Sequence, residues 1–227
     1  MIGVLVNGGA IVAGSLAGIL FKKAMNEELN DALMKAFALI ILYLGFSGAT
    51  VGTNITVELL SLTIGCAIGT LLDLDGRFNR FSDKLGKKIS RKDEPGGFAV
   101  GFVNGTVIFC VGAVAIMGAL EAGLTGETTL LFAKAVLDFI VAMIMASTMG
   151  IGVAFAALAV ILYEGFFVIV SAAAEPYLSE YVVNEISCVG FLAVVAIGFN
   201  IMGITKIKVV NLIPAVFIPI VLCLFIK

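Results

Sequence analysis

Eight apolar stretches constrain this chain more than any other feature of its sequence. A membrane-spanning helix needs about 20 mostly apolar residues. The stretches are 2–21, 33–51, 55–72, 98–120, 129–147, 150–173, 183–204 and 209–226. They lack the alternating polarity that the strands of a membrane β-barrel require. The sequence therefore predicts an all-α polytopic membrane protein of about eight transmembrane helices, in a single domain that spans residues 1–227.

Composition excludes most other classes of protein. Hydrophobic residues make up 61% of the chain and charged residues only 13%, whereas a soluble domain is about a quarter charged. There is no His, which excludes a Ser-His-Asp triad and a His-ligated metal. We therefore expect no enzymatic activity, no metal or cofactor and no nucleic-acid partner. The cysteines lie inside apolar stretches without a CxxC motif, so they read as packing residues: Cys66, Cys110, Cys188 and Cys223.

Basic residues predict the orientation in the membrane. Segment 73–96 contains seven of them, which favours a cytoplasmic location. In the eight-helix order, Lys22, Lys23, Lys206 and Lys208 fall on the same side. The sequence thus predicts a multi-pass protein of the cytoplasmic (inner) membrane with both termini outside. Five glutamates are expected on the outer side: Glu121, Glu127, Glu175, Glu180 and Glu185.

The basic segment 73–96 is also amphipathic. Its apolar residues recur at the spacing of one helix face: Leu74, Phe78, Phe81, Leu85 and Ile89. An in-plane helix of this kind contacts anionic membrane lipids. The segment is expected to fix topology and anchor the chain, and a regulatory sensor is the alternative.

Two pairs of short motifs suggest an inverted repeat. Val6-Asn7-Gly8 matches Val103-Asn104-Gly105, and Lys35-Ala36 matches Lys134-Ala135 at nearly the same offset. Units of three helices each would enter the membrane from opposite sides, an architecture typical of secondary transporters. The units would be residues 1–75 and 97–173, with the helices of 183–226 outside them.

Glycines and prolines predict how the helices pack and where they break. Small residues four positions apart allow close helix contact, by default within the chain, with a homo-oligomer face as the alternative. Pro214 and Pro219 predict a kinked last helix or, alternatively, a broken helix that lines a site. Residues 147–150 predict a tight turn. The glycine pairs are Gly14/Gly18, Gly65/Gly69 and Gly101/Gly105.

Ionisable residues within the apolar stretches are the candidates for function. Lys134 and Asp138 share one helix face at i,i+4 spacing, as a self-compensating buried pair or as a gating pair. Glu164 has no neutralising residue one turn away, so it suits a neutral, proton-carrying glutamate or a hydrogen-bonded structural one. Weaker candidates for the polar path are Asn7, Asn104 and Asn200.

Several motifs together resemble one family, the bacterial and archaeal integral membrane proteins of unknown function typified by YdfK and YqgA. The resemblance covers essentially the whole chain and implies a prokaryotic membrane protein and a transporter. The resemblance implies that the Lys134/Asp138 pair and the residue after Tyr163 belong to the family's sequence pattern. An amide side chain is expected after Tyr163, whereas this chain has Glu164. The motifs are Ile108–Gly112, Met117–Leu120, Lys134–Asp138, Tyr163–Gly165, Gly203–Ile207, Asn211–Pro214 and Leu71–Arg77.

These observations predict a small secondary transporter or channel. A small solute or ion would cross the membrane along a polar path gated by Lys134, Asp138 and Glu164. Protonation or ion binding at a carboxylate would shift the balance between the open states. The alternative is a non-transporting scaffold that binds lipid or a protein partner, which would have a tightly packed apolar centre around Asp138.

Overall fold

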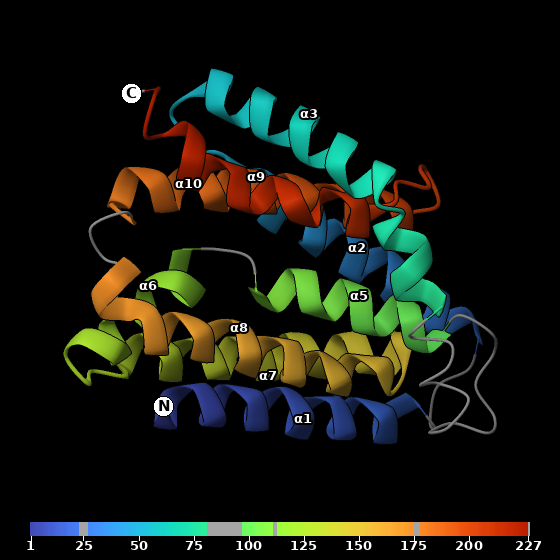
Figure 1. Cartoon of the computed structure of the whole chain (residues 1–227). Helices are drawn as coiled ribbons and strands as arrows, with labels where there is room; N and C mark the ends of the chain where they lie inside the picture. Colours follow the sequence, from blue (N-terminus) through green and yellow to red (C-terminus); the bar gives the residue numbers. More distant parts are fainter. Residues whose placement is uncertain (23–26, 81–96, 111–112, 175–177, 227) are drawn as a thin grey trace. The chain divides into compact units, whose positions relative to one another are not determined.

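Helices are the only regular secondary structure in the part of the chain that the computed structural model describes, residues 1–22, 27–80, 97–110, 113–174 and 178–226, which confirms the predicted all-α fold. Figure 1 shows the helices. A further short helix, Leu74–Arg80, follows α3. In chain order the others are α1 (Ile2–Lys22), α2 (Glu27–Ala49), α3 (Ile55–Leu71), α5 (Gly97–Cys110), α6 (Ala113–Leu124), α7 (Thr129–Met149), α8 (Gly152–Ala174), α9 (Glu180–Ile201), the 3₁₀ helix η2 (Val209–Phe217) and α10 (Ile218–Leu222).

Four of the described helices are long and apolar enough to cross a membrane: α1, α7, α8 and α9. Two bent pairs of helices raise this number to six if each pair is one span. Shorter apolar helices cover Met34–Ala49 and Val209–Leu222. Large apolar side chains are exposed on the helix surfaces, Leu162 to 74% and Ile169 to 77%, as contact with lipid requires. The count of eight spans and the inverted repeat stay predictions.

Two of the predicted stretches are not single α-helices. Residues 98–120 were expected as one span, but α5 ends at Cys110 and α6 begins at Ala113 in a direction that differs by 61°. The last stretch contains the 3₁₀ helix η2 with Pro214 inside it, followed by α10 with Pro219 at its start. Proline cannot donate a backbone hydrogen bond and clashes with the preceding turn, which explains the departure from α-helix here.

The amphipathic segment is described only in part. Leu74 and Phe78 lie in the helix Leu74–Arg80, in agreement with the predicted helical spacing. The other members of the apolar face, Phe81, Leu85 and Ile89, lie outside the described residues.

The chain forms two compact units, and the segments of the two alternate along the sequence. Unit 1 consists of Met1–Phe37, Asn79–Cys110 and Val114–Ala172, and unit 2 consists of Ala38–Phe78, Val111–Ala113 and Ala173–Lys227. Unit 1 therefore combines α1, α5, α6, α7 and α8, whereas unit 2 combines α3, α9, η2 and α10. These boundaries differ from those of the predicted three-helix repeat.

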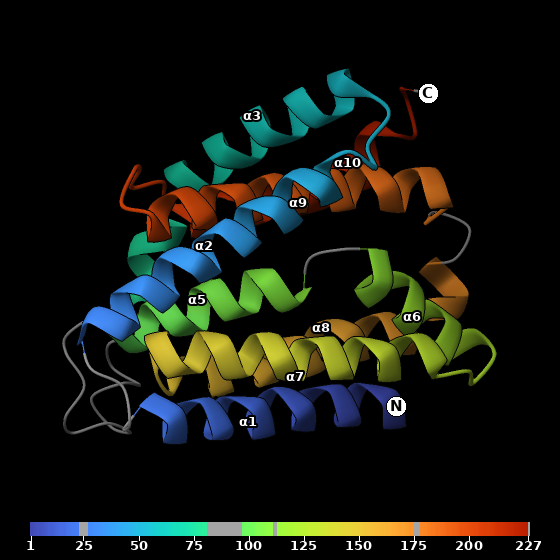
Figure 2. The same ribbon diagram turned by 180° about the vertical axis from the view of Figure 1, so that it is seen from behind.

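Helix α1 runs parallel to α7 in unit 1 and contacts it along its length (Figures 1 and 2). A Cβ atom added to Gly14 would lie 2.3 Å from the backbone oxygen of Phe139, and one added to Gly18 would lie 2.1 Å from that of Met143. Only glycine allows the two backbones to approach this closely. The turn from α7 to α8 uses Gly150 at φ +79°, as the predicted tight turn requires.

In unit 2 a second glycine pair packs α3 against η2. A Cβ atom added to Gly65 would lie 2.3 Å from the Cα atom of Ala215, and one added to Gly69 would lie 2.1 Å from the backbone oxygen of Asn211. The order of these contacts makes the two helices antiparallel. Both glycine pairs are therefore used for packing within the chain, which is the default that their spacing predicts.

The N-terminus of α7 is capped by the side chain of Glu127. Its carboxylate accepts hydrogen bonds from the backbone N–H groups of Thr128 and Thr129, each 3.1 Å long. The hydroxyl group of Thr129 donates a further hydrogen bond, and these bonds hold the pKa of Glu127 below its usual value. An anion at this position also complements the helix dipole.

The close contact between α1 and α7 makes a testable prediction. Replacing Gly14 with alanine forces the two backbones apart, and we expect it to destabilise the folded protein by about 1–3 kcal/mol. Gly9 on the same helix is the matched control, because a Cβ atom there meets nothing within 4 Å. Thermal unfolding in lipid nanodiscs measures both variants. Equal stability of Gly14→Ala and Gly9→Ala would contradict the observed packing.

Candidate functional site

Four polar side chains from three helices meet in the interior of unit 1. Lys134 and Asp138, one turn apart on α7, form an ion pair, as the i,i+4 spacing predicted. The Lys134 Nζ atom also lies 3.4 Å from Oε1 of Glu164 on α8. The amide Nδ2 of Asn7 on α1 donates a 2.9 Å hydrogen bond to the same Glu164 oxygen. We call these four residues the charged cluster.

The charged cluster is almost completely buried. Asn7 and Glu164 have no exposed surface, and Lys134 and Asp138 are exposed by only 6% and 8%. A charged group at bilayer depth costs at least about 2.5–3.5 kcal/mol on insertion scales, so such groups need close partners. With both carboxyl groups ionised, one lysine faces two carboxylates and the cluster carries one net negative charge. The ion pairs observed here thus supply one cation for two carboxyl groups.

Two oxygen atoms of the cluster have no hydrogen-bond partner. They are Oε2 of Glu164 and Oδ1 of Asn7, both buried. A buried polar atom without a partner costs about 1–3 kcal/mol. In the cluster as it stands, two acceptor oxygens therefore lack a hydrogen-bond donor.

The end of α5 lies near the charged cluster. Cys110, the last residue of α5, is within electrostatic range of Lys134, Glu164 and Asp138. The sequence identified this cysteine only as a packing residue, because nothing in an apolar stretch shows which polar groups face it. Interrupted helices beside buried polar groups are typical of transporter binding sites.

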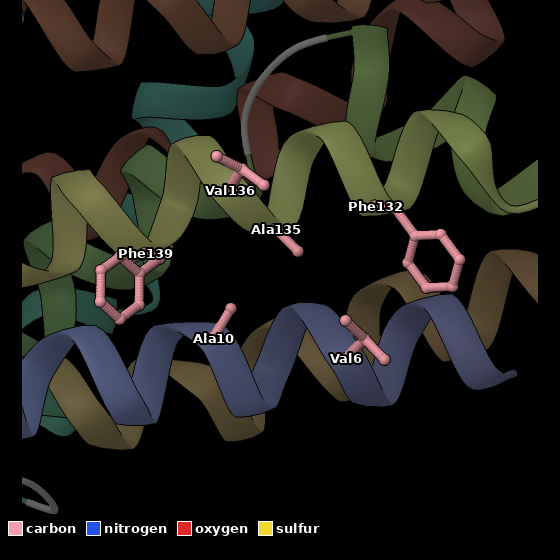
Figure 3. Close-up of a pocket in the computed structure, with 6 residues that line it drawn as sticks. All are labelled: Val6, Ala10, Phe132, Ala135, Val136 and Phe139. Carbon is pink, nitrogen blue, oxygen red and sulfur yellow. The ribbon is translucent and has the colours of Figure 1, made fainter.

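An apolar pocket of about 390 Å³ lies between α1 and α7 (Figure 3). The rings of Phe132 and Phe139 flank it, and Ala10 and Ala135 lie between them, on α1 and α7 respectively. Val6 and Val136 complete its lining. None of the charged cluster lines this pocket, although Asn7 and Lys134 directly adjoin lining residues in the sequence. The low exposure of the four side chains shows that the conformation described here is closed around the cluster.

The other two predicted asparagines have local partners. Asn104 on α5 lies in unit 1, where its Nδ2 atom is 3.8 Å from the sulfur of Met149. Asn200 lies in unit 2, where its side chain hydrogen-bonds to the backbone N–H and carbonyl of Ile207 and to the hydroxyl of Thr205. Asn200 thus holds the turn that follows α9, and neither residue is a hydrogen-bond partner in the charged cluster.

A third buried carboxyl group, that of Glu185, was not among the candidates from the sequence. It was counted among the outer charges, but it lies in α9 with no exposed surface. Its Oε1 atom accepts hydrogen bonds from the backbone N–H groups of Thr53 and Asn54, at 2.8 and 3.1 Å. This carboxylate therefore ties α9 to the turn before α3 in unit 2. No signal in the sequence connects these positions, which are 132 residues apart.

The described residues contain no group of three or more His, Cys, Asp or Glu side chains that could hold a metal ion. The charged cluster consists of two carboxyl groups, one ammonium group and one amide group. This set can bind and release a proton or hold a small polar solute, and it offers no activated nucleophile.

Comparison with known proteins identifies the family. The family described as "Protein of unknown function (DUF554)" matches residues 2–224, and the chain belongs to it. The chain is 32% identical to "Uncharacterized membrane protein YdfK" of Bacillus subtilis (strain 168), over 96% of this chain and 94% of that protein. It is 28% identical to "Uncharacterized protein YqgA" of Escherichia coli (strain K12), with the same coverage. No solved structure matches. The resemblance read from the sequence motifs is confirmed.

Proposed function

We propose that this member of the DUF554 family is a small secondary transporter or channel of the cytoplasmic membrane. It moves a small solute or ion along a polar path that Lys134, Asp138 and Glu164 gate, together with Asn7. The observation that carries the proposal is the charged cluster, in which three helices place an incompletely compensated set of charges inside the helical bundle.

The closed state of the cluster fits one step of such a cycle. A transporter that alternates between two open states passes through a conformation in which its polar site is shielded from both sides. Opening has to separate α1 from α7 and α8, because Asn7 on α1 is hydrogen-bonded to Glu164 on α8. Water would then reach the carboxyl groups and solvate their negative charge.

A non-transporting scaffold is the second candidate. The apolar pocket and the closed packing around Asp138 favour it, because a scaffold needs no water-filled path. It does not explain why two buried oxygens lack partners, since a purely structural polar network is expected to be fully hydrogen-bonded.

Flux through reconstituted protein separates the two candidates. Proteoliposomes loaded with a pH-sensitive dye, and in parallel with radiolabelled sodium, rubidium or chloride, report movement of each ion. We expect the double variant Asp138→Asn/Glu164→Gln to reduce the flux of the transported ion at least about tenfold. Asp31→Asn is the matched control, since it breaks a Lys–Asp pair of the same spacing that is 64% exposed. No flux above empty liposomes for these ions, or unchanged flux in the double variant, would contradict the proposal.

A further inference from the structure

The two unpartnered oxygens of the charged cluster belong to groups that are already bonded to each other. Asn7 donates its Nδ2–H to Oε1 of Glu164, and the atoms left over are Oδ1 of the same amide and Oε2 of the same carboxyl. Both leftover atoms accept hydrogen bonds when Glu164 is ionised. When Glu164 is ionised, Oδ1 of Asn7 and Oε2 of Glu164 are therefore both buried acceptors, and neither carries a hydrogen that it could donate to the other.

One proton on Glu164 satisfies both of these atoms. A carboxylic acid and a primary amide are planar forks, each with one donor and one acceptor available for the other. The O–H group at Oε2 would donate to Oδ1 of Asn7, while Nδ2 of Asn7 donates to Oε1 as observed. The two hydrogen bonds would close a ring between α1 and α8.

The same proton balances the charge of the cluster. Glu164 contacts Lys134 of α7 and Asn7 of α1. Within its electrostatic range are also Asp138 from α7, Cys110 from α5 and Tyr163 on its own helix. Lys134 already pairs with Asp138, and none of the other groups is cationic. A neutral Glu164 thus brings the net charge from minus one to zero, which a buried site strongly favours.

A metal cation fits this position poorly. Hard cations such as Ca²⁺ take about 6–8 oxygen ligands, whereas two oxygens of the charged cluster lack partners. The ammonium group of Lys134, 3.4 Å from Oε1 of Glu164, would also repel a cation. The cluster favours a proton because a proton needs only the two oxygens that are free.

We propose that Glu164 holds one exchangeable proton in the closed conformation, donated to Oδ1 of Asn7, and that this proton is the ion coupled to transport. The coupling rests on the function proposed above, whereas the proton site does not. A proton from water binds to Oε2 of Glu164 and returns to water when the cluster opens, and no other bond is made or broken. Acid conditions therefore favour the closed conformation, and alkaline conditions favour opening.

Infrared difference spectroscopy tests the proton site directly. Purified protein in lipid, compared between acid and alkaline pH, should show the C=O stretching band of a protonated carboxyl group that disappears on the alkaline side. The band should be absent in Glu164→Gln, whose amide can donate to Asn7 in place of the acid and so keeps the fold. It should shift in Asn7→Leu, which removes the acceptor. Asp31→Asn should leave it unchanged.

Each outcome bears on one claim. A band that persists in Glu164→Gln places the proton elsewhere and overturns the inference, as does a band that does not shift in Asn7→Leu. A band with the expected behaviour in a protein that shows no proton flux establishes the proton site and overturns its coupling to transport. A proton flux without the band contradicts the proton site and leaves the transport function standing.

Discussion

Replacing Lys134 with methionine should be among the most damaging single changes in the chain. The ammonium group contacts both buried carboxyl groups, Asp138 and Glu164. Without it, the Asp138 carboxylate would remain inside the bundle with no cation, and the loss of one partner from a buried ion pair costs about 3–5 kcal/mol. We expect a correspondingly lower free energy of unfolding and a lower yield of folded protein, measured by thermal unfolding in lipid nanodiscs.

Two further variants show that charge, and not side-chain size, is responsible. The triple variant Lys134→Met/Asp138→Asn/Glu164→Gln has no charge left in the cluster, so it should recover most of the lost stability. Lys35→Met is the matched control, because Lys35 pairs with Asp31 at 2.6 Å on an exposed surface. Exposed pairs contribute about 0–1 kcal/mol. If Lys134→Met were as stable as Lys35→Met, the cluster would not be the buried charged site described here.

The part of the cluster that the sequence predicted lies within one helix. Lys134 and Asp138 are a turn apart, and helical spacing alone places them together. The sequence also indicated that Glu164 needs a partner, but not which one. Its hydrogen-bond donor Asn7 lies 157 residues away, and only the packing of α1 against α7 and α8 brings the two together. Contacts between helices depend on rotation and register, which a single sequence does not encode locally.

The breaks and boundaries of the helices were predicted less well than the helices themselves. Apolar composition continues through residues 98–120, so nothing marked the change of direction between α5 and α6. Glu185 was placed on the outer side by the predicted order of the helices, which does not show whether its side chain is buried. Its burial depends on the backbone N–H groups of Thr53 and Asn54, which donate hydrogen bonds to the carboxylate. The prolines of the last stretch did signal its irregularity, because their effect on the backbone is local.

Replacing Asp138 with asparagine should abolish the pH dependence of the cluster. In this variant Lys134 has a single carboxyl partner, Glu164, whose Oε1 atom already lies 3.4 Å from its Nζ atom. The cluster is then neutral when Glu164 is ionised, so the proton is no longer needed to balance the charge. We expect the carboxyl band to be missing across the pH range and proton flux to fall about tenfold or more, because the exchangeable proton is lost.

The comparison of Asp138→Asn with Glu164→Gln distinguishes this explanation from a simple loss of structure. Both variants remove one carboxyl group and both leave a neutral cluster, so both should fold, and both should lack the band. The two variants differ in the interactions that hold the closed state. Asp138→Asn depends on the ion pair between Lys134 and Glu164. Glu164→Gln keeps the ion pair between Lys134 and Asp138, and its amide can form the proposed hydrogen-bonded ring with Asn7. A band of wild-type intensity in Asp138→Asn would show that Glu164 takes its proton whatever its neighbours carry. Desolvation alone would then govern the site, and the charge balance among Lys134, Asp138 and Glu164 would not.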